Sequence, residues 1–176
     1  MISILIDIFN LFLRDLSSCS LNTISEDTFR NLTVLEKLYL DLNPLGPSLL
    51  SDIFAGFMDM KSLSMNNCDL ENIAIGTFRS MQQLQELDLG FNKLTHICKG
   101  TLEGLTNQLN KLWLNHNRIK TIGDETFKQL TCLEKFTLTN NLLTTVPDLK
   151  GLTFFNTLSF ERNRIIDVSR IATSGN

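Results

Sequence analysis

Apolar residues recur along this chain with a period of about two dozen residues. One polar or cysteine position marks the period, at successive steps of 24, 25, 24, 25, 24 and 22 residues. Its seven members, here called the ladder column, are Cys19, Asn43, Cys68, Asn92, Asn117, Asn141 and Asn163. Around each lies the frame Leu-x-x-Leu-x-Leu-x-x-Asn/Cys-x-Leu, with some substitutions. Self-similarity at a fixed period indicates a repeat architecture.

The Leu-x-Leu alternation just before each ladder position predicts a short strand. We expect each strand to pair with its counterpart in the next repeat, which gives one long parallel sheet. The inward leucines then fill a core that neighbouring repeats share. A single repeat cannot bury its own apolar face, so the stability of such a chain comes from contacts between neighbours.

A second pair of apolar positions closes each repeat. A large ring follows the ladder position by ten residues, and leucine or an equivalent follows three residues later, as in Phe29/Leu32, Phe78/Met81 and Phe127/Leu130. Phe54 and Phe57 fit the same pattern with one residue inserted near Gly46, whereas Leu102/Leu105 keeps the spacing and loses the ring. The frame and these rings recur too often to be accidental.

Together these residues resemble the leucine-rich repeat family, in particular its type of about 24 residues with a spine of phenylalanines. The resemblance extends from about Leu11 to Ile171. It implies an α/β-type solenoid of about seven repeats: a right-handed horseshoe with a concave parallel β-sheet and an irregular or 3-10 convex arc. We therefore expect the solenoid over residues 11–171 and a polar tail at 172–176. Residues 1–13 are expected to form a degraded first strand and cap, or a weak signal-like segment.

The ladder column is expected to satisfy the backbone of the turn that follows each strand. A buried backbone group without a partner is costly, and an asparagine amide offers both donors and an acceptor. Cys19 and Cys68 are interpreted as small ladder substitutes instead of redox centres. Cys98 and Cys132 lie outside the column, so free or core thiols are expected there, with a disulfide between them as the minor alternative.

Side chains between the ladder leucines should face outward on the concave sheet. The only tryptophan and the only tyrosine of the chain, Trp113 and Tyr39, occupy one such column. Trp113 is expected to form a ligand-binding patch with its neighbours on adjacent rungs. The residues predicted to bind a ligand are Trp113, His116, Phe91, Asp88, Lys111 and Asn115, with Tyr39 and Leu42 as a second contact.

Several of these residues have a simpler interpretation. Phe91 precedes the ladder asparagine, where aromatic rings also pack on the ladder, so both interpretations stay open. Tyr39 and Leu42 are also compatible with a simple surface pair. His116 has no second ligand nearby, and its counterpart His96 lies in another phase of the repeat, so no metal site is predicted.

The composition and charge of the chain argue against some classes of partner. The net charge is −3 and the isoelectric point near 5.4, without a basic run, which argues against nucleic acid as a partner. No apolar stretch is long enough to insert in a membrane. The run from Met1 to Leu13 lacks the cationic start of a signal peptide and contains Asp7. Asn31-Leu32-Thr33 is a glycosylation sequon on the predicted outer arc.

These features predict a non-catalytic binding module without a cofactor. No P-loop, nucleophile-elbow or HExxH motif is present. The resemblance implies a piece of an extracellular receptor or adhesion ectodomain, as in Toll-like receptors, that recognises a protein ligand or co-receptor in signalling, adhesion or innate immunity. A matrix protein like the small leucine-rich proteoglycans, and an intracellular adaptor or ligase targeting domain, remain as alternatives. The oligomeric state is left open.

Overall fold

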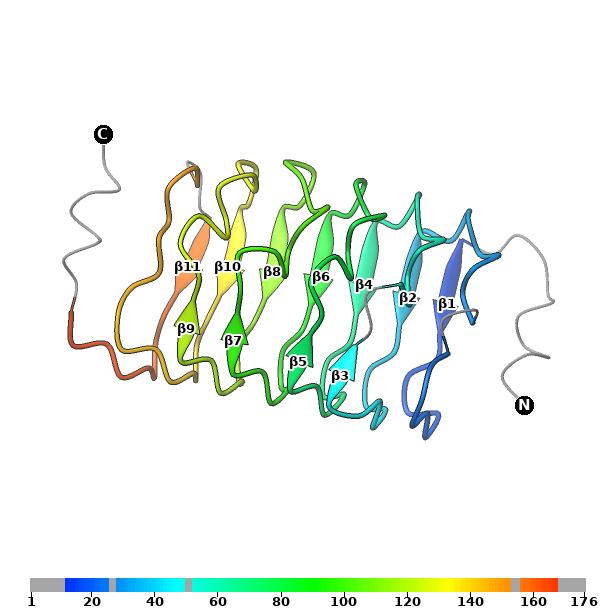
Figure 1. The fold of residues 1–176 in the computed structure, drawn as a ribbon, viewed down its shortest axis with the longest axis horizontal. Helices are drawn as coiled ribbons and strands as arrows, with labels where there is room; N and C mark the ends of the chain where they lie inside the picture. Colours follow the sequence, from blue (N-terminus) through cyan, green and yellow to red (C-terminus); the bar gives the residue numbers. More distant parts are fainter. Residues whose placement is uncertain (1–11, 26–27, 50–51, 153–155, 168–176) are drawn as a thin grey trace.

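The computed structural model describes residues 12–25, 28–49, 52–152 and 156–167, and within them the chain forms one long parallel sheet (Figure 1). Seven strands of three residues each lie side by side in chain order. They are β1 (Leu13–Asp15), β2 (Lys37–Tyr39), β4 (Ser62–Ser64), β6 (Glu86–Asp88), β8 (Lys111–Trp113), β10 (Lys135–Thr137) and β11 (Thr157–Ser159). Each coil therefore contributes one strand, and the predicted parallel solenoid is confirmed.

The register of the sheet follows the sequence period without a slip. The central residues of the strands pair in one row: Arg14, Leu38, Leu63, Leu87, Leu112, Phe136 and Leu158. A shift of one residue would turn this apolar row outward, so the burial of its leucines fixes the pairing. Arg14 replaces the core leucine only in β1, at the first rung, where it is half-buried.

The core lies between the sheet and the opposite arc and runs through the described coils. Leu112 and Leu114 are fully buried, and each such leucine contributes about 1.5–3 kcal/mol relative to an exposed one. Rings of the phenylalanine spine meet across coils: Phe29 lies 6.2 Å from Phe54 and 5.3 Å from Phe57, measured between ring centroids. Apolar contacts between coils therefore hold the stack together.

The convex arc consists of successive turns. Leu130 N donates to Phe127 O at 2.9 Å, and Leu133 N donates to Leu130 O at 3.1 Å, which are bonds between residues three apart. The described residues contain no helix, α or 3-10, and thus no helix among them is long and apolar enough to cross a membrane. The expected arc is thus irregular and built from separate single turns.

Two short parallel pairs, which the sequence did not predict, add to the main sheet. The strand β3 (Ser48–Leu49) pairs with β5 (Asn72–Ile73), and β7 (His96–Ile97) pairs with β9 (Thr121–Ile122). They lie on the nearer side of the coil in Figure 1. Each pair links the arcs of two neighbouring coils by backbone hydrogen bonds, which limits how far these arcs can separate.

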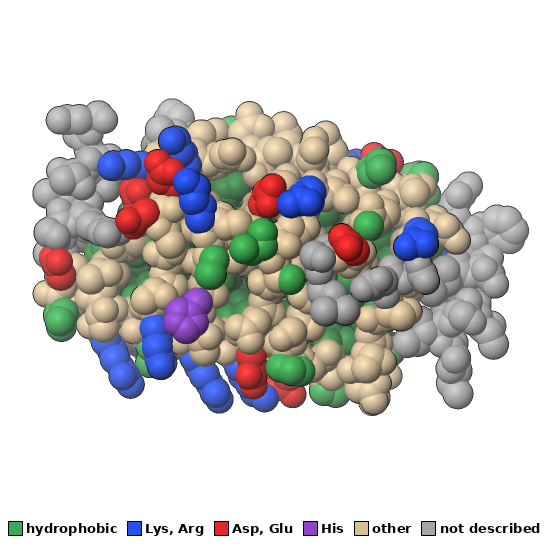
Figure 2. Space-filling model, in the orientation of Figure 1, with side chains coloured by type: hydrophobic (Ala, Val, Ile, Leu, Met, Phe, Trp, Pro, Cys, Tyr) green, Lys and Arg blue, Asp and Glu red, His purple; other side chains and the backbone are tan. Residues whose placement is uncertain are grey.

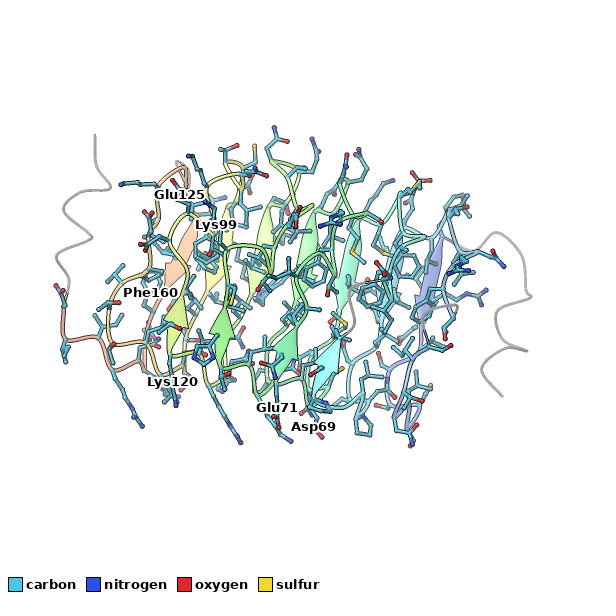
Figure 3. All side chains as sticks on the ribbon, viewed as in Figure 1. Asp69, Glu71, Lys99, Lys120, Glu125 and Phe160 are labelled. Atoms are coloured by element: carbon cyan, nitrogen blue, oxygen red, sulfur yellow. The ribbon has the colours of Figure 1, made fainter. Side chains whose placement is uncertain are left out.

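The arc has a hollow where the spine loses its ring. A space of about 560 Å³ opens between residues 99–105 and 125–130, and Leu102, Leu105 and Leu130 line its apolar part. At its rim Lys99 Nζ lies 2.7 Å from Glu125 Oε2, a pair that Figure 3 labels.

Residues 1–11 and 168–176 lie outside the described residues, so the expectations for a signal-like segment and a polar tail refer to parts that the structure does not describe.

Candidate ligand-binding face and its supporting ladder

The ladder column holds the turn that ends each strand. Asn117 shows the arrangement: its Nδ2 donates to Leu89 O at 2.9 Å and Leu114 O at 3.2 Å, and its Oδ1 accepts from Leu94 N at 3.0 Å. Asn43, Asn92, Asn141 and Asn163 likewise each bond to the coil before them and to their own strand. The amides thus tie each coil to its predecessor.

The two cysteines of this column differ from each other. Cys68 is buried, and its Sγ contacts Leu40 O at 3.1 Å. It offers no amide oxygen, and here Leu45 N donates to the local Asn43 O at 2.8 Å instead of reaching the next coil. Burial raises the pKa of the Cys68 thiol to about 11, so the group stays protonated. Cys19 is exposed, because it lies on the first coil, which has only one neighbouring coil among the described residues.

Backbone strain accompanies each ladder turn. The residue before every ladder position has a left-handed backbone: Ser18, Leu42, Asn67, Phe91, His116, Asn140 and Arg162, with φ between 54° and 57°. Residues other than glycine and asparagine rarely adopt this conformation, which costs about 1–2 kcal/mol each. The conformation turns these seven side chains away from the ladder. The sequence period located this column, but it did not predict the left-handed backbone of its residues.

Trp113 lies on the concave face, in register with Asp88 of β6 and Thr137 of β10. The indole is half-buried, less open than the sequence suggested. Lys135 Nζ lies 5.3 Å from the ring centroid, within the range of a cation–π contact. Lys135 was not among the predicted residues. Its place before the central core residue of the next repeat could have indicated it, because that column adjoins the tryptophan column.

Phe91 and His116 form a stacked pair on the turns that follow β6 and β8. Their ring centroids are 4.1 Å apart with an angle of 9° between the planes, and Phe91 remains 48% exposed. The Asn140 amide donates to Nε2 of His116 at 3.1 Å. Phe91 therefore packs on a neighbouring ring. We call Phe91, Trp113 and His116 the aromatic patch.

A polar network crosses the same face. Asp41 accepts from the Ser64 hydroxyl at 2.5 Å and from Asn66 N at 2.8 Å. Asp88 Oδ1 accepts from Gly90 N at 2.7 Å, and Asn66 Nδ2 lies 3.3 Å from Asp88 Oδ2. Burial raises the pKa of Asp88, and the charge of Asp41 adds to the effect. The network thus holds two carboxylates in the middle of the sheet.

The remaining predicted residues lie around this centre. Lys111 Nζ is 2.6 Å from Glu86 Oε1 on the adjacent strand, so it is paired at the side of the sheet. Asn115 Oδ1 accepts from Thr137 Oγ1 at 3.1 Å. Tyr39 is half-buried, and Leu42 is 56% exposed. The structure places these two on β2 and the turn after it, with β4 and β6 between them and Trp113, so they do not join the aromatic patch.

Cationic side chains gather elsewhere. Figure 2 shows Lys and Arg side chains projecting along the lower edge of the molecule, and Figure 3 places Lys120, Glu71 and Asp69 along that edge. Lys93 pairs with Asp69 at 2.7 Å. On the face seen in Figure 2 the hydrophobic side chains are scattered among polar ones. No group of three or more potential metal ligands occurs within the described ranges.

The comparisons with known proteins agree with this architecture. The family model described as leucine-rich repeat matches residues 58–108 and 107–165. The chain belongs to the leucine-rich repeat family. A sequence comparison with curated proteins gives no match.

Solved structures of leucine-rich repeat proteins share its fold. The Drosophila Toll chain of a Toll–Spätzle complex matches with a TM-score of 0.78 and 22% identity, over 84% of this chain and 21% of that one. The chain of a TLR13–ssRNA13 complex matches with 0.75 and 29%, over 86% and 21%. A leucine-rich repeat protein of Leptospira interrogans matches with 0.75 and 27%, over 91% and 39%. This chain spans about a fifth of the Toll and TLR13 chains.

Proposed function

We propose that this leucine-rich repeat chain is a non-catalytic module that binds a protein ligand on its concave face, through the aromatic patch. The observation that carries the proposal is a stacked Phe91–His116 pair, with His116 three residues after Trp113 in the same coil. Large rings surrounded by polar side chains are typical of the anchor points of protein interfaces. A parallel sheet of short strands holds such side chains in fixed positions, so little conformational entropy is lost when a partner binds.

The proposed setting is an extracellular receptor or adhesion ectodomain of which this chain is a part. The similarity to Toll, solved in complex with Spätzle, supports a receptor role. Asn31 of the sequon is exposed on the outer arc, where a glycan would not touch the concave face. A glycan on Asn31 in the natural protein would support this setting, whereas its absence together with reduced thiols at Cys98 and Cys132 would favour the intracellular alternative.

Single-stranded RNA is the second ligand class to consider, because TLR13 was solved with ssRNA13. Rings that stack in pairs also stack on bases. RNA binding further requires cations along the backbone path, yet Asp88 is the register partner of Trp113 and Asp41 lies in the adjoining column, and Lys135 is a single cation over the indole. We therefore favour protein, and a single-stranded RNA oligonucleotide enters the test as a competing probe.

The test is a selection of a displayed library of random 12-residue peptides on the wild-type chain, followed by titration calorimetry with the selected peptides. Trp113→Ala should weaken binding by about tenfold or more, as expected for an interface anchor, and leave the melting temperature within a few degrees. Met58→Ala is the matched control, because Met58 is a large apolar side chain that is 63% exposed away from the sheet strands.

Selected peptides that bind both variants as tightly as wild type would remove the concave patch from consideration. Tighter binding of the RNA oligonucleotide than of any peptide, with the same loss in Trp113→Ala, would replace the protein ligand by nucleic acid.

A further inference from the structure

We propose that the concave face recognises an arginine side chain of its protein ligand, which lies against Trp113 and pairs with Asp88. This inference rests on the proposed function, and it names the chemistry of the group that binds there. It follows from an unpaired carboxylate, a ring beside it and the distribution of charge over the sheet.

The first step is the state of Asp88. Its side chain is half-buried, and no residue that the structure describes forms an ion pair with it. Oδ1 accepts a short bond from Gly90 N at 2.7 Å, but Oδ2 has only the long contact of 3.3 Å with the Asn66 amide. A carboxylate oxygen can accept two bonds. Asp88 therefore keeps acceptor capacity and an uncompensated charge, and both would be satisfied by a donor that carries a positive charge.

The second step is the fixed position of that carboxylate. A Cβ on residue 90 would lie only 3.0 Å from Asp88 Oδ1, 3.1 Å from Asn66 Nδ2 and 3.3 Å from Asn115 Nδ2. Glycine at this place lets the three polar groups converge over the backbone. The carboxylate is thus held in one place before any ligand arrives, which reduces the entropy lost on binding.

The third step is the ring beside it. Asp88 and Trp113 are register partners on adjacent strands, which lie about 4.8 Å apart. Lys135 already places its ammonium 5.3 Å from the indole centroid, which shows that a cation is accommodated there. Lys135 comes from β10 and Asp88 from β6, on opposite sides of β8. A guanidinium entering from the β6 side would meet the indole and the carboxylate together. Arginine suits this geometry better than lysine, because its planar group stacks and forms two parallel bonds.

The fourth step is charge complementarity over the face. In the two columns that contain Trp113 and Asn115, every charged residue is acidic: Asp15, Asp41, Asp88 and Glu161. The lysines of the sheet strands, at 37, 111 and 135, are each the first residue of a strand and so form a separate column at the side of the sheet. Lys111 is neutralised there by Glu86. A basic segment of a partner is therefore attracted to the centre of the sheet and oriented by its rim.

The test uses the peptides selected on the wild-type chain, each synthesised with arginine and with citrulline, its neutral isostere. Binding is measured by calorimetry and by the fluorescence of Trp113, the only tryptophan. Citrulline should weaken binding by about tenfold or more, and Asp88→Asn should do the same for the arginine peptide. On Asp88→Asn the two peptides should differ little, because the partner charge is gone. The control Glu71→Gln removes the same charge from an exposed residue at the edge, and affinity should stay within about twofold.

Each other outcome has a defined meaning. Peptides that lose affinity in Trp113→Ala but contain no arginine, or tolerate citrulline and Asp88→Asn, would overturn the arginine site and leave the proposed function intact. An equal loss in Glu71→Gln would show a general attraction between an acidic chain and basic peptides, and would also overturn it. Binding indifferent to Trp113→Ala would remove both proposals.

Discussion

Replacing Asn117 by alanine removes a link between two adjacent coils at the centre of the solenoid. The substitution deletes two donations, to Leu89 O at 2.9 Å and Leu114 O at 3.2 Å, and one acceptance from Leu94 N at 3.0 Å. All three backbone groups belong to buried residues. A hydrogen bond contributes about 1 kcal/mol net, and an orphaned buried group costs about 1–3 kcal/mol. We therefore expect a loss of about 3 kcal/mol in the free energy of unfolding.

The assay is urea denaturation at equilibrium, followed by far-ultraviolet circular dichroism and by the fluorescence of Trp113. Coincident curves from the two probes show whether one transition is being measured. Asn107→Ala is the control, because Asn107 is exposed on the convex arc. Asn117→Cys should lose less than the alanine variant, since the Cys68 thiol contacts a strand carbonyl from the same column. A loss in Asn117→Ala no larger than in the control would refute a structural role of the ladder amides.

Three further predictions concern the core, the strained column and the buried charge. Leu114→Ala should lower the free energy of unfolding by about 2–5 kcal/mol in the same assay, because the side chain is fully buried. Leu42→Asn should raise it by about 1 kcal/mol, because φ at this exposed residue is 57° and asparagine tolerates that conformation; a loss would contradict the strain argument. Because burial raises the pKa of Asp88 above its ordinary 3.8, native Asp88 is protonated at higher pH than unfolded Asp88, and its ionised form costs stability above the native pKa. Asp88→Asn should therefore raise the melting temperature at pH 7, and this gain should shrink as the pH falls from the native pKa to 3.8; a gain that does not depend on pH would refute the origin in the carboxyl charge.

The fold could be read from the sequence because its period fixes which residues are buried. The positions of Leu112 and Leu114 recur with the same spacing in every coil and are apolar except at Arg14, and only one register buries the apolar rows. The short strands β3 and β7 escaped prediction because their pairing depends on how the arcs meet in space. Nothing in the two residues of such a strand distinguishes it from the turns around it.

The candidate site was predictable in part. The column of Trp113 followed from the period, but the partners of each side chain did not. Lys135 lies over the indole because the next strand places it there, and Lys111 pairs with Glu86 instead of joining the patch. These arrangements depend on charge pairing between coils. The left-handed backbone of this column was also hidden, since leucine and phenylalanine, which occupy it at Leu42 and Phe91, do not signal that conformation.

Acrylamide quenching of Trp113 tests most directly whether this face binds the ligand, because no other tryptophan contributes to the emission. The quenching constant is measured in the free chain and in the chain saturated with a selected peptide. Contact of the ligand with the half-buried indole predicts weaker quenching and an emission maximum at shorter wavelength in the complex. Identical quenching and emission at saturation would place the ligand elsewhere and contradict the account.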